Sequence, residues 1–172
     1  MAGLAEEIDS TQDVSNRKGG KYLTLSIGDE EYGISILKIK EIIGMLPITT
    51  VPQTPEFVKG VINLRGKVIP VIDLRLRFSM KAIPYTERTC IIVVEVEGKE
   101  NTIQTGIVVD SVSEVLNIKD DEIADTPTFG MNMNTEYILG IAKMEDSVEI
   151  LLDINKVMNV GEIEALKDST DR

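Results

Sequence analysis

Carboxylates are the most plentiful chemically active side chains of this chain, which has 29 Asp and Glu residues and no histidine among its 172 residues. The absence of histidine removes the usual general base, every Ser-His-Asp arrangement and most zinc sites. Two carboxylates can still hydrolyse a bond, one as the acid and one as the base or nucleophile. Asp73, Asp110 and Asp153 are the candidates for such a carboxylate hydrolase.

Two of these aspartates have another explanation. Asp73 and Asp153 each stand at the end of a predicted strand and just before a short helical pattern. An aspartate at such a position caps the free backbone N–H groups of the helix. The sequence also lacks a calcium loop, a phosphate-binding loop and a dinucleotide-binding glycine motif. These features favour a binding module without metal or cofactor, and the hydrolase stays as the alternative from another class.

The net charge of −11 limits the classes of partner. Without a cluster of Lys and Arg, neither nucleic acid nor an anionic membrane surface is an expected partner. Residues 1–20 lack the features of a signal peptide, and no apolar run is long enough to cross a membrane. Cys90 lies in an apolar run and is expected to be a buried structural thiol, which fits a reducing cytoplasm.

The elements that must position these residues are mainly strands, because Ile, Val and Leu dominate the apolar residues. Alternation predicts a half-buried strand over 22–27. Ser35 is expected to cap a short helix over 36–43, which Gly44 would end. Pro70 inside a predicted strand indicates a sheet edge or a bulge. Further strands are predicted at 48–51, 89–96 and 102–110, and short helices within 155–167.

The most informative segment is a predicted β-hairpin at 60–74. A second hairpin at 140–154 repeats its strands without gaps, but it does not repeat the turn. In the same order, 32–43 aligns with 105–116. Such internal similarity predicts a duplication, with two related barrels of about five strands each. Chance similarity between Ile- and Val-rich strands is the alternative.

The unshared turn is the first candidate for a functional feature. Asn63 and Gly66 suit a tight turn by themselves. Leu64 and Arg65 are not required by the hairpin, because the second copy has 143–146 as Lys-Met-Glu-Asp in the equivalent place. We expect an exposed leucine beside an arginine to offer a partner an apolar anchor and a set of hydrogen-bond donors. A solvated turn residue is the alternative for Arg65.

Six segments in order along the chain carry a family resemblance: 28–34, 36–39, 54–60, 63–66, 71–75 and 106–110. Taken together, and over roughly residues 21–158, they resemble the CheW family of bacterial chemotaxis coupling proteins. The resemblance implies a mainly β, CheW-like fold with two intertwined five-stranded SH3-like β-barrel subdomains, short helices and a shared apolar core. We expect a flexible N-terminal tail at 1–20, one domain at 21–158 with a pseudo-repeat around 22–78 and 89–158, and a C-terminal helix and tail at 159–172.

The resemblance also implies a function. It predicts a cytoplasmic, non-enzymatic adaptor that joins the regulatory domain of the histidine kinase CheA to the cytoplasmic tips of methyl-accepting chemoreceptors. Through receptor arrays the adaptor would be recruited to the inner face of the membrane, and in isolation it would be a monomer. A scaffold of another chemosensory pathway, controlling pilus motility or a second messenger, is the close alternative. A fragment of a longer kinase is not expected, because no kinase or phospho-acceptor segment is present.

Carried over by position, the resemblance predicts a receptor-binding groove with Arg65 as its central polar residue. Glu41 lies beside this groove and is expected to bind receptor or kinase. The kinase contact would be barrel against barrel, with 129–137 and 52–59 as candidate segments. The other predicted receptor-binding residues are Ile39, Gly60, Asn63, Leu64, Gly66, Ile91, Gly106 and Val112.

Overall fold

A computed structural model describes residues 18–98, 100–125 and 136–158. Most of the predicted N-terminal tail, the predicted helix and tail from residue 159 onwards and all but the end of the candidate loop 129–137 lie outside the described residues.

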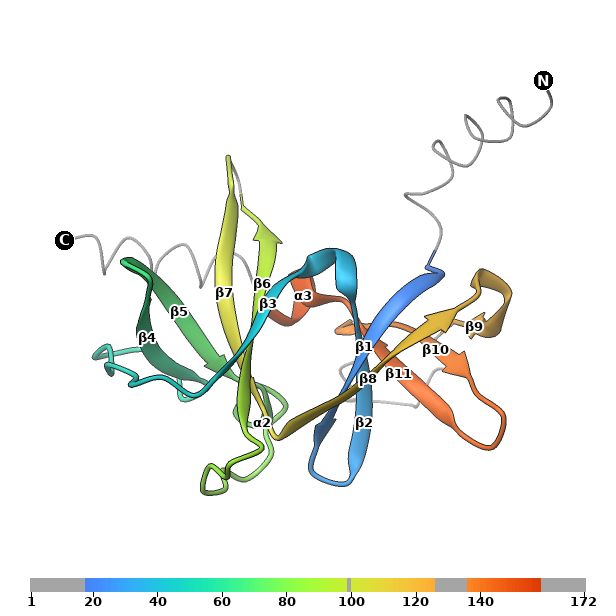
Figure 1. The fold of residues 1–172 in the computed structure, drawn as a ribbon, viewed down its shortest axis with the longest axis horizontal. Helices are drawn as coiled ribbons and strands as arrows, with labels where there is room; N and C mark the ends of the chain where they lie inside the picture. The colour runs from blue at the N-terminus through green and yellow to red at the C-terminus, as the bar shows by residue number, and fades with distance from the viewer. Residues whose placement is uncertain (1–17, 99, 126–135, 159–172) are drawn as a thin grey trace.

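Two curved sheets make up the described part of the chain (Figure 1). Subdomain 1 is the five-stranded sheet, in the order β3-β6-β7-β5-β4, and subdomain 2 is the six-stranded sheet, in the order β8-β1-β2-β11-β10-β9. The strands are β1 (Gly20–Ile27), β2 (Glu30–Ser35), β3 (Ile39–Gly44), β4 (Val58–Leu64), β5 (Lys67–Asp73), β6 (Cys90–Glu97), β7 (Thr102–Val109), β8 (Ser111–Ile118), β9 (Ile123–Ala124), β10 (Ile138–Lys143) and β11 (Val148–Leu152). The short helices are η2 (Ile36–Lys38), α2 (Leu74–Arg77), η3 (Asp120–Glu122) and α3 (Ile154–Met158).

The two subdomains are intertwined, as predicted. β1 and β2 belong to subdomain 2, although the five strands of subdomain 1 follow them directly in sequence. The chain therefore crosses between the subdomains twice, at η2 and between β7 and β8. Two parallel pairs, β2 with β11 and β5 with β7, join the two halves of the chain. Each half of the sequence repeat thus supplies strands to both subdomains.

The strand register confirms that the sequence repeat is a structural repeat. Val71 pairs with Gly106 in subdomain 1, and Leu151 pairs with Gly33 in subdomain 2. These are the pairs that the two sequence alignments place in equivalent positions. A Cβ on Gly106 would lie 2.8 Å from Ile91 Cγ2, and one on Gly33 would lie 2.9 Å from Leu151 Cδ2. Close packing therefore requires glycine at both places.

Asp73 and Asp153 cap helices, as the sequence predicted. Asp73 Oδ1 accepts hydrogen bonds from two backbone N–H groups in the first turn of α2. Asp153 Oδ1 accepts one from the N–H of Lys156, at 3.4 Å. The backbone N–H groups of the two aspartates donate to the carbonyls of Phe57 and Tyr137, each at 2.8 Å. The capping sites are thus equivalent in detail.

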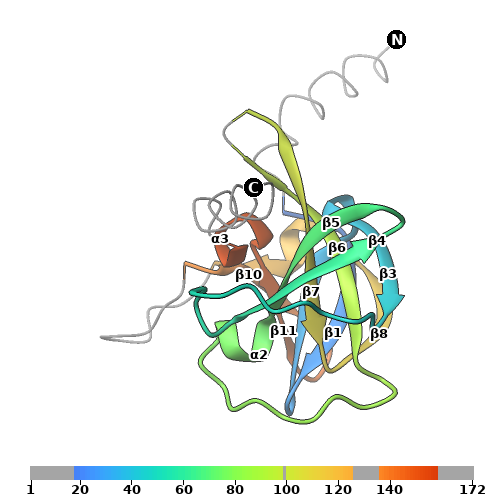
Figure 2. The same ribbon diagram turned by 90° about the vertical axis from the view of Figure 1, so that its left-hand side faces the viewer.

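A shared apolar core lies between the sheets, as predicted. It combines Leu25 and Ile34 of subdomain 2 with Ile92 and Ile107 of subdomain 1. Cys90 is buried in this core, and burial raises the pKa of its thiol. Each subdomain also has an apolar interior of its own. Subdomain 1 lies at the front of Figure 2. These interiors contain Ile62, Leu64, Ile69, Val71, Ile91, Val93 and Val108 in subdomain 1, and Tyr22, Ile118, Ala142 and Leu151 in subdomain 2.

The predicted helix over 36–43 is wrong. Ser35 Oγ does accept a hydrogen bond from the N–H of Leu37, at 3.3 Å, but the 3₁₀ turn η2 ends at Lys38. The chain then forms β3, in which Ile42 pairs with Ile92 of β6. The β-branched residues of this segment therefore form a strand because a neighbouring strand is available to pair with them.

Two predictions for neighbouring strands also change. The strand expected at 48–51 reduces to a single bridge between Thr49 and Val61, which brings the chain after β3 against β4. Pro70 is not on an edge strand, because β5 lies between β4 and β7. However, β7 pairs only with Val71, Ile72 and Asp73, so Pro70 stands where β5 has no partner on that side.

Asp110 holds the crossing from β7 to β8. Its carboxylate accepts hydrogen bonds from Arg75 Nε at 2.9 Å and Arg75 Nη2 at 2.8 Å, and from the N–H of Gly28 at 2.7 Å. Burial alone would raise the pKa of Asp110, but the hydrogen bonds from Arg75 and Gly28 outweigh it and lower this pKa. Asp110 therefore connects α2 of subdomain 1, through Arg75, to the turn after β1 of subdomain 2, through Gly28.

Replacing Asp110 with asparagine should lower the free energy of unfolding at pH 7 by about 2 kcal/mol, because it removes a charged partner of a largely buried arginine. The folded-state pKa of Asp110 is lowered, so the stabilisation is present above its unfolded-state value near 4 and is lost as the pH falls through the folded-state value. Denaturant unfolding at pH 7 and at pH 2.5 measures both effects.

Glu97→Gln is the control, because Glu97 forms an exposed pair with Lys38 at 3.8 Å. Its effect should stay within about 0.5 kcal/mol. Equal effects of Asp110→Asn and Glu97→Gln would contradict the structural role of Asp110.

Candidate functional site

The predicted turn is a two-residue hairpin loop formed by Arg65 and Gly66, since Leu64 pairs directly with Lys67. The φ angles of Arg65 and Gly66 are +52° and +87°. Positive φ at both loop positions is typical of a type I′ turn. Asn63 Oδ1 accepts a hydrogen bond from the N–H of Gly66 at 2.8 Å. Asn63 and Gly66 therefore close the turn, as expected.

Leu64 is not the exposed anchor that the sequence predicted. It is 8% exposed and lies in the interior of subdomain 1 with Ile62 and Ile69. The loop is so short that Leu64 still belongs to β4, where alternate residues face the same side. The prediction of an exposed leucine is therefore wrong.

Arg65 is exposed and forms an ion pair with Glu41 of β3. The pair connects the tip of the β4–β5 hairpin to the edge strand of the same subdomain. Hydrogen bonding to Glu41 raises the pKa of the Arg65 guanidinium, so the arginine stays charged. An arginine at positive φ is uncommon, and Asn or Gly would suit the position better. This backbone outlier makes Arg65 a functional candidate.

The second hairpin shows that this scaffold does not require an arginine. The N–H of Met144 donates to the carbonyl of Ser147 at 2.9 Å, which leaves the same two-residue loop, here Glu145 and Asp146. Among the described non-glycine residues, positive φ occurs at Gln53, Arg65 and Ser79, and neither loop residue is among these. The turn is thus where the two copies differ most.

A groove of about 590 Å³ lies between the edge strands β3 and β8, which occupy equivalent positions in the two subdomains. Edge strands leave backbone groups free to bind a partner. The groove is lined by Ser26, Ile42, Ile43, Gly44, Arg88, Cys90, Ser111, Val112 and Ser113.

Three predicted site residues, Ile39, Glu41 and Val112, lie on the strands that form this groove. Ile39 pairs with Val94, and Val112 pairs with Leu25, at equivalent positions of the repeat. Both are half-buried and pack against the shared core, and only Val112 lines the groove. Asn63, Arg65 and Gly66 are exposed beside β3, on the hairpin that Glu41 contacts.

Three further predicted residues lie beneath the surface. Ile91 is completely buried, and Gly106 packs directly against it. Gly60 has a φ of +142°, and a Cβ there would lie only 2.0 Å from the carbonyl oxygen of Thr49. These residues shape the wall of subdomain 1, and the structure does not expose them to a partner.

The sequence analysis missed three exposed apolar residues. Ile42 and Val115 occupy equivalent positions and are 43% and 53% exposed, and Leu37 of η2 is 87% exposed. Because residues 36–43 were predicted as a helix, the alternation of half-buried and exposed residues that places Ile42 on the outer side of β3 was not recognised. Once the strand is recognised, this alternation is visible in the sequence.

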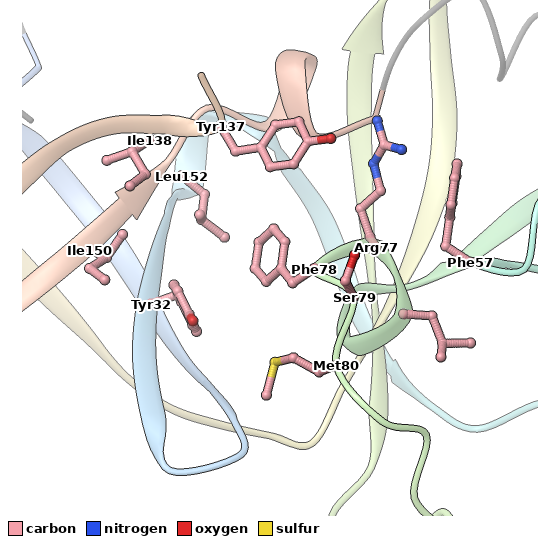
Figure 3. A pocket seen from close by; sticks show the side chains of 11 residues that line it. Tyr32, Phe57, Arg77, Phe78, Ser79, Met80, Tyr137, Ile138, Ile150 and Leu152 are labelled. Carbon is pink, nitrogen blue, oxygen red and sulfur yellow. The ribbon is translucent and has the colours of Figure 1, made fainter. Parts of the chain in front are cut away.

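A second hollow, of about 670 Å³, lies beside α2 (Figure 3). The guanidinium of Arg77 lies 4.3 Å from the ring centre of Phe57 and 5.2 Å from that of Tyr137. The ring of Phe78 faces into the hollow, 5.6 Å from Tyr32 and 6.0 Å from Tyr137. Because Phe57 and Tyr137 are repeat equivalents, this aromatic cluster joins the two halves of the fold.

The carboxylates considered for hydrolysis all have structural partners. Besides capping α2, Asp73 accepts a hydrogen bond from the Tyr85 hydroxyl at 3.2 Å, and burial together with Asp73 raises the pKa of Tyr85. Asp110 is paired with Arg75, and Asp153 caps α3. Within 18–98, 100–125 and 136–158, no group of three or more His, Cys, Asp or Glu residues could hold a metal ion. No helix in these ranges is long and apolar enough to cross a membrane.

Comparison with known proteins gives a consistent result. Residues 21–162 match the family model described as the CheW-like domain. The chemotaxis protein CheW of Klebsiella aerogenes is 39% identical over 169 residues, covering 98% of this chain and 97% of that protein. Protein FrzA of Myxococcus xanthus is 29% identical over 146 residues, with coverage of 82% and 86%.

A solved structure agrees with the fold. The scaffolding protein TtCheW from Thermoanaerobacter tengcongensis is 35% identical and superposes with a TM-score of 0.73. The match covers 84% of this chain and 95% of that chain. The mainly β architecture with two SH3-like subdomains is therefore shared with a solved scaffold.

Arg65→Asn should leave the melting temperature unchanged or raise it, because asparagine adopts positive φ more readily and an exposed ion pair stabilises little. Arg65→Val is the comparison variant with the opposite expected effect. A β-branched residue is strained at positive φ, so this substitution should lower the melting temperature. Thermal unfolding followed by circular dichroism compares the three proteins. A marked loss of stability in Arg65→Asn would show that the pair with Glu41 is structural.

Proposed function

The chain belongs to the CheW family of chemotaxis adaptor proteins, and from this we propose that it joins the histidine kinase CheA to the cytoplasmic tips of methyl-accepting chemoreceptors. The observation that carries this proposal is Arg65, held at positive φ on an exposed hairpin loop. Neither the turn nor the scaffold requires an arginine there, so a partner is the simplest reason for it.

The receptor surface in this proposal is the groove between β3 and β8 together with the hairpin that carries Arg65. In this proposal Ile42 and Val112 supply apolar contacts from the groove. The exposed hairpin adds a charged contact through Arg65 and its partner Glu41 of β3. An apolar centre with a polar rim suits a moderate, reversible contact. Ile39, Asn63 and Gly66 belong to the same surface, while Gly60, Leu64, Ile91 and Gly106 support it from beneath.

In this proposal the kinase contact is a barrel-to-barrel interface with the regulatory domain of CheA. Val68 and Val148 fit such a contact, because they are 54% and 57% exposed at equivalent positions of β5 and β11. The connection 52–59 and the loop 129–137 remain candidate segments, and Glu41 remains a candidate for either partner. Binding to receptors would recruit the protein, a monomer in isolation, to the inner face of the membrane.

The proposed role is non-enzymatic, since each candidate catalytic carboxylate already has a structural partner. A scaffold in another chemosensory pathway, such as one controlling pilus motility or a second messenger, is the second candidate. The similarity to FrzA favours keeping it. The higher identity to proteins named CheW favours the first candidate.

Arg65→Ala should weaken binding to a receptor cytoplasmic fragment by about tenfold while leaving the fold intact, because it removes a charged donor from the rim of the contact. Titration of the purified protein with the fragment measures the dissociation constant, and circular dichroism checks the fold. Unchanged binding to both receptor and kinase would contradict the assigned role.

Ile42→Asp should lower receptor affinity by more than about tenfold, because it places a charge in the apolar part of the groove. The matched control is Val148→Asp, which adds the same charge at an exposed valine of β11, outside both this groove and the hairpin that carries Arg65. The control should retain receptor affinity in the same titration. Equal losses in both variants would indicate a general charge effect and reject the groove as the receptor surface.

A further inference from the structure

The two copies of the repeat differ inside their barrels. In subdomain 1 the interior position two residues before Val71 is Ile69, which is 2% exposed and packs in an apolar cluster. The equivalent position of subdomain 2 is Glu149, two residues before Leu151. Glu149 is 5% exposed. A carboxyl group thus replaces a core isoleucine in otherwise equivalent architecture.

Glu149 faces the interior of subdomain 2. It shares a face of β11 with Leu151, which lies in that interior, and it pairs across the sheet with the fully buried Ala142 of β10. Its Oε1 atom is buried and has no hydrogen-bond partner. An unpartnered buried carboxylate oxygen is costly, so some positively charged or proton-donating group is needed there.

Two more carboxylates converge on the same point. Glu31 precedes Tyr32, the residue of β2 that pairs with Ile150, so Glu31 lies beside Glu149 on the neighbouring strand. Burial first, and then Glu31 and Glu114 of β8, raise the pKa of Glu149 to about 7. A positive charge beside these carboxylates would therefore favour the ionised form of Glu149.

The equivalent place in subdomain 1 indicates which cation would suit the carboxylates of subdomain 2. The equivalent of Glu114 there is Glu41, and Arg65 from the hairpin tip neutralises it. In subdomain 2 the equivalent of Arg65 is Glu145, so the hairpin offers a negative charge instead. In the part of the chain that the structure describes, the ion pairs do not include Glu31, Glu114 or Glu149.

We propose that the mouth of subdomain 2, formed by Glu31, Glu114 and Glu149, binds an arginine side chain of a partner protein. The planar guanidinium carries five donors and can satisfy several carboxylate oxygens at once, including the orphaned Oε1 of Glu149. The partner would supply in trans what Arg65 supplies within the chain to subdomain 1. The site shares β8 with the groove between β3 and β8, but none of its three carboxylates lines that groove. It does not depend on which proteins the adaptor joins.

Binding of the guanidinium favours the ionised form of Glu149. Affinity should therefore rise with pH through about 7, where Glu149 loses its proton, and fall in more acidic solution. The groups facing Glu149 from the packed strands are Glu31 of β2 and Glu114 of β8, with Ala142 opposite on β10. All the titratable groups in this set carry the same sign of charge.

The test is a titration of the full chain with N-acetyl-arginine amide, followed by backbone NMR at pH 8 and pH 6. The neutral N-acetyl-citrulline amide is the matched probe. We expect saturable shifts confined to the amides around Glu31, Glu114 and Glu149, with a dissociation constant on the order of millimolar. Binding should be weaker at pH 6 and absent with the citrulline compound.

Glu149→Ile makes subdomain 2 resemble subdomain 1 at this position and should abolish the shifts while raising the melting temperature. Glu149→Gln keeps the shape, removes the charge and should also abolish them. Glu97→Gln removes one exposed charge from β6 of subdomain 1 and should leave them unchanged. Equal shifts with the citrulline compound, or shifts that persist in both Glu149 variants, would overturn the proposal. So would tighter binding of Mg²⁺ at the same amides, which would indicate a metal site.

Discussion

Two parallel strand pairs, β2 with β11 and β5 with β7, are the constraint on which the rest of the structure depends. Each pair joins a strand from one half of the chain to a strand from the other. The pairs bring backbone and side chains so close that Gly33 and Gly106 cannot be replaced without displacing their neighbours. Because the halves are exchanged in this way, neither barrel is built from one continuous half of the repeat, and both barrels share the same apolar core. A small mainly β chain thereby gains a large shared core in addition to the separate interiors of its two barrels.

This exchange also creates the surface assigned to receptors. The chain must cross between the subdomains before β3 and before β8, which leaves both strands at sheet edges on either side of a groove. Asp110 fixes one of these crossings through Arg75 and Gly28. The groove is thus a consequence of the topology, and its shape depends on the same contacts that stabilise the fold.

Function is most visible where the two copies of the repeat differ. Equivalent hairpins end in Arg65 and Gly66 in one subdomain and in Glu145 and Asp146 in the other. Equivalent barrel interiors contain Ile69 in one and Glu149 in the other. In each case one copy shows what the scaffold requires, so the residue in the other copy needs a separate explanation. Such an internal comparison is available without any relative of the protein.

Patterns local in sequence predicted much of this architecture. Alternation and the repeat predicted the hairpins, and the position of Asp73 and Asp153 predicted their caps. Residues 36–43 were predicted as a helix because Ser35 does cap a helical turn there. The strand β6 that pairs with this segment is about fifty residues further along the chain, so the local sequence does not reveal the pairing.

The contacts at the candidate sites join residues distant in sequence, which is why they were missed. The ion pair of Glu41 and Arg65 spans 24 residues, and the neighbourhood of Glu149 and Glu31 depends on a parallel pair between the two ends of the domain. Leu64 is buried because the hairpin loop has only two residues, which keeps Leu64 in β4. The residue types of the turn did not by themselves predict so short a loop.

The most direct test of the adaptor function is co-sedimentation of the kinase CheA with a chemoreceptor cytoplasmic fragment, with and without this protein. We predict that the kinase enters the receptor pellet in stoichiometric amounts only when this protein is present, and that this protein pellets with the receptor even without the kinase. Equal recovery of the kinase with and without this protein, or failure of this protein to pellet with either partner, would contradict the account.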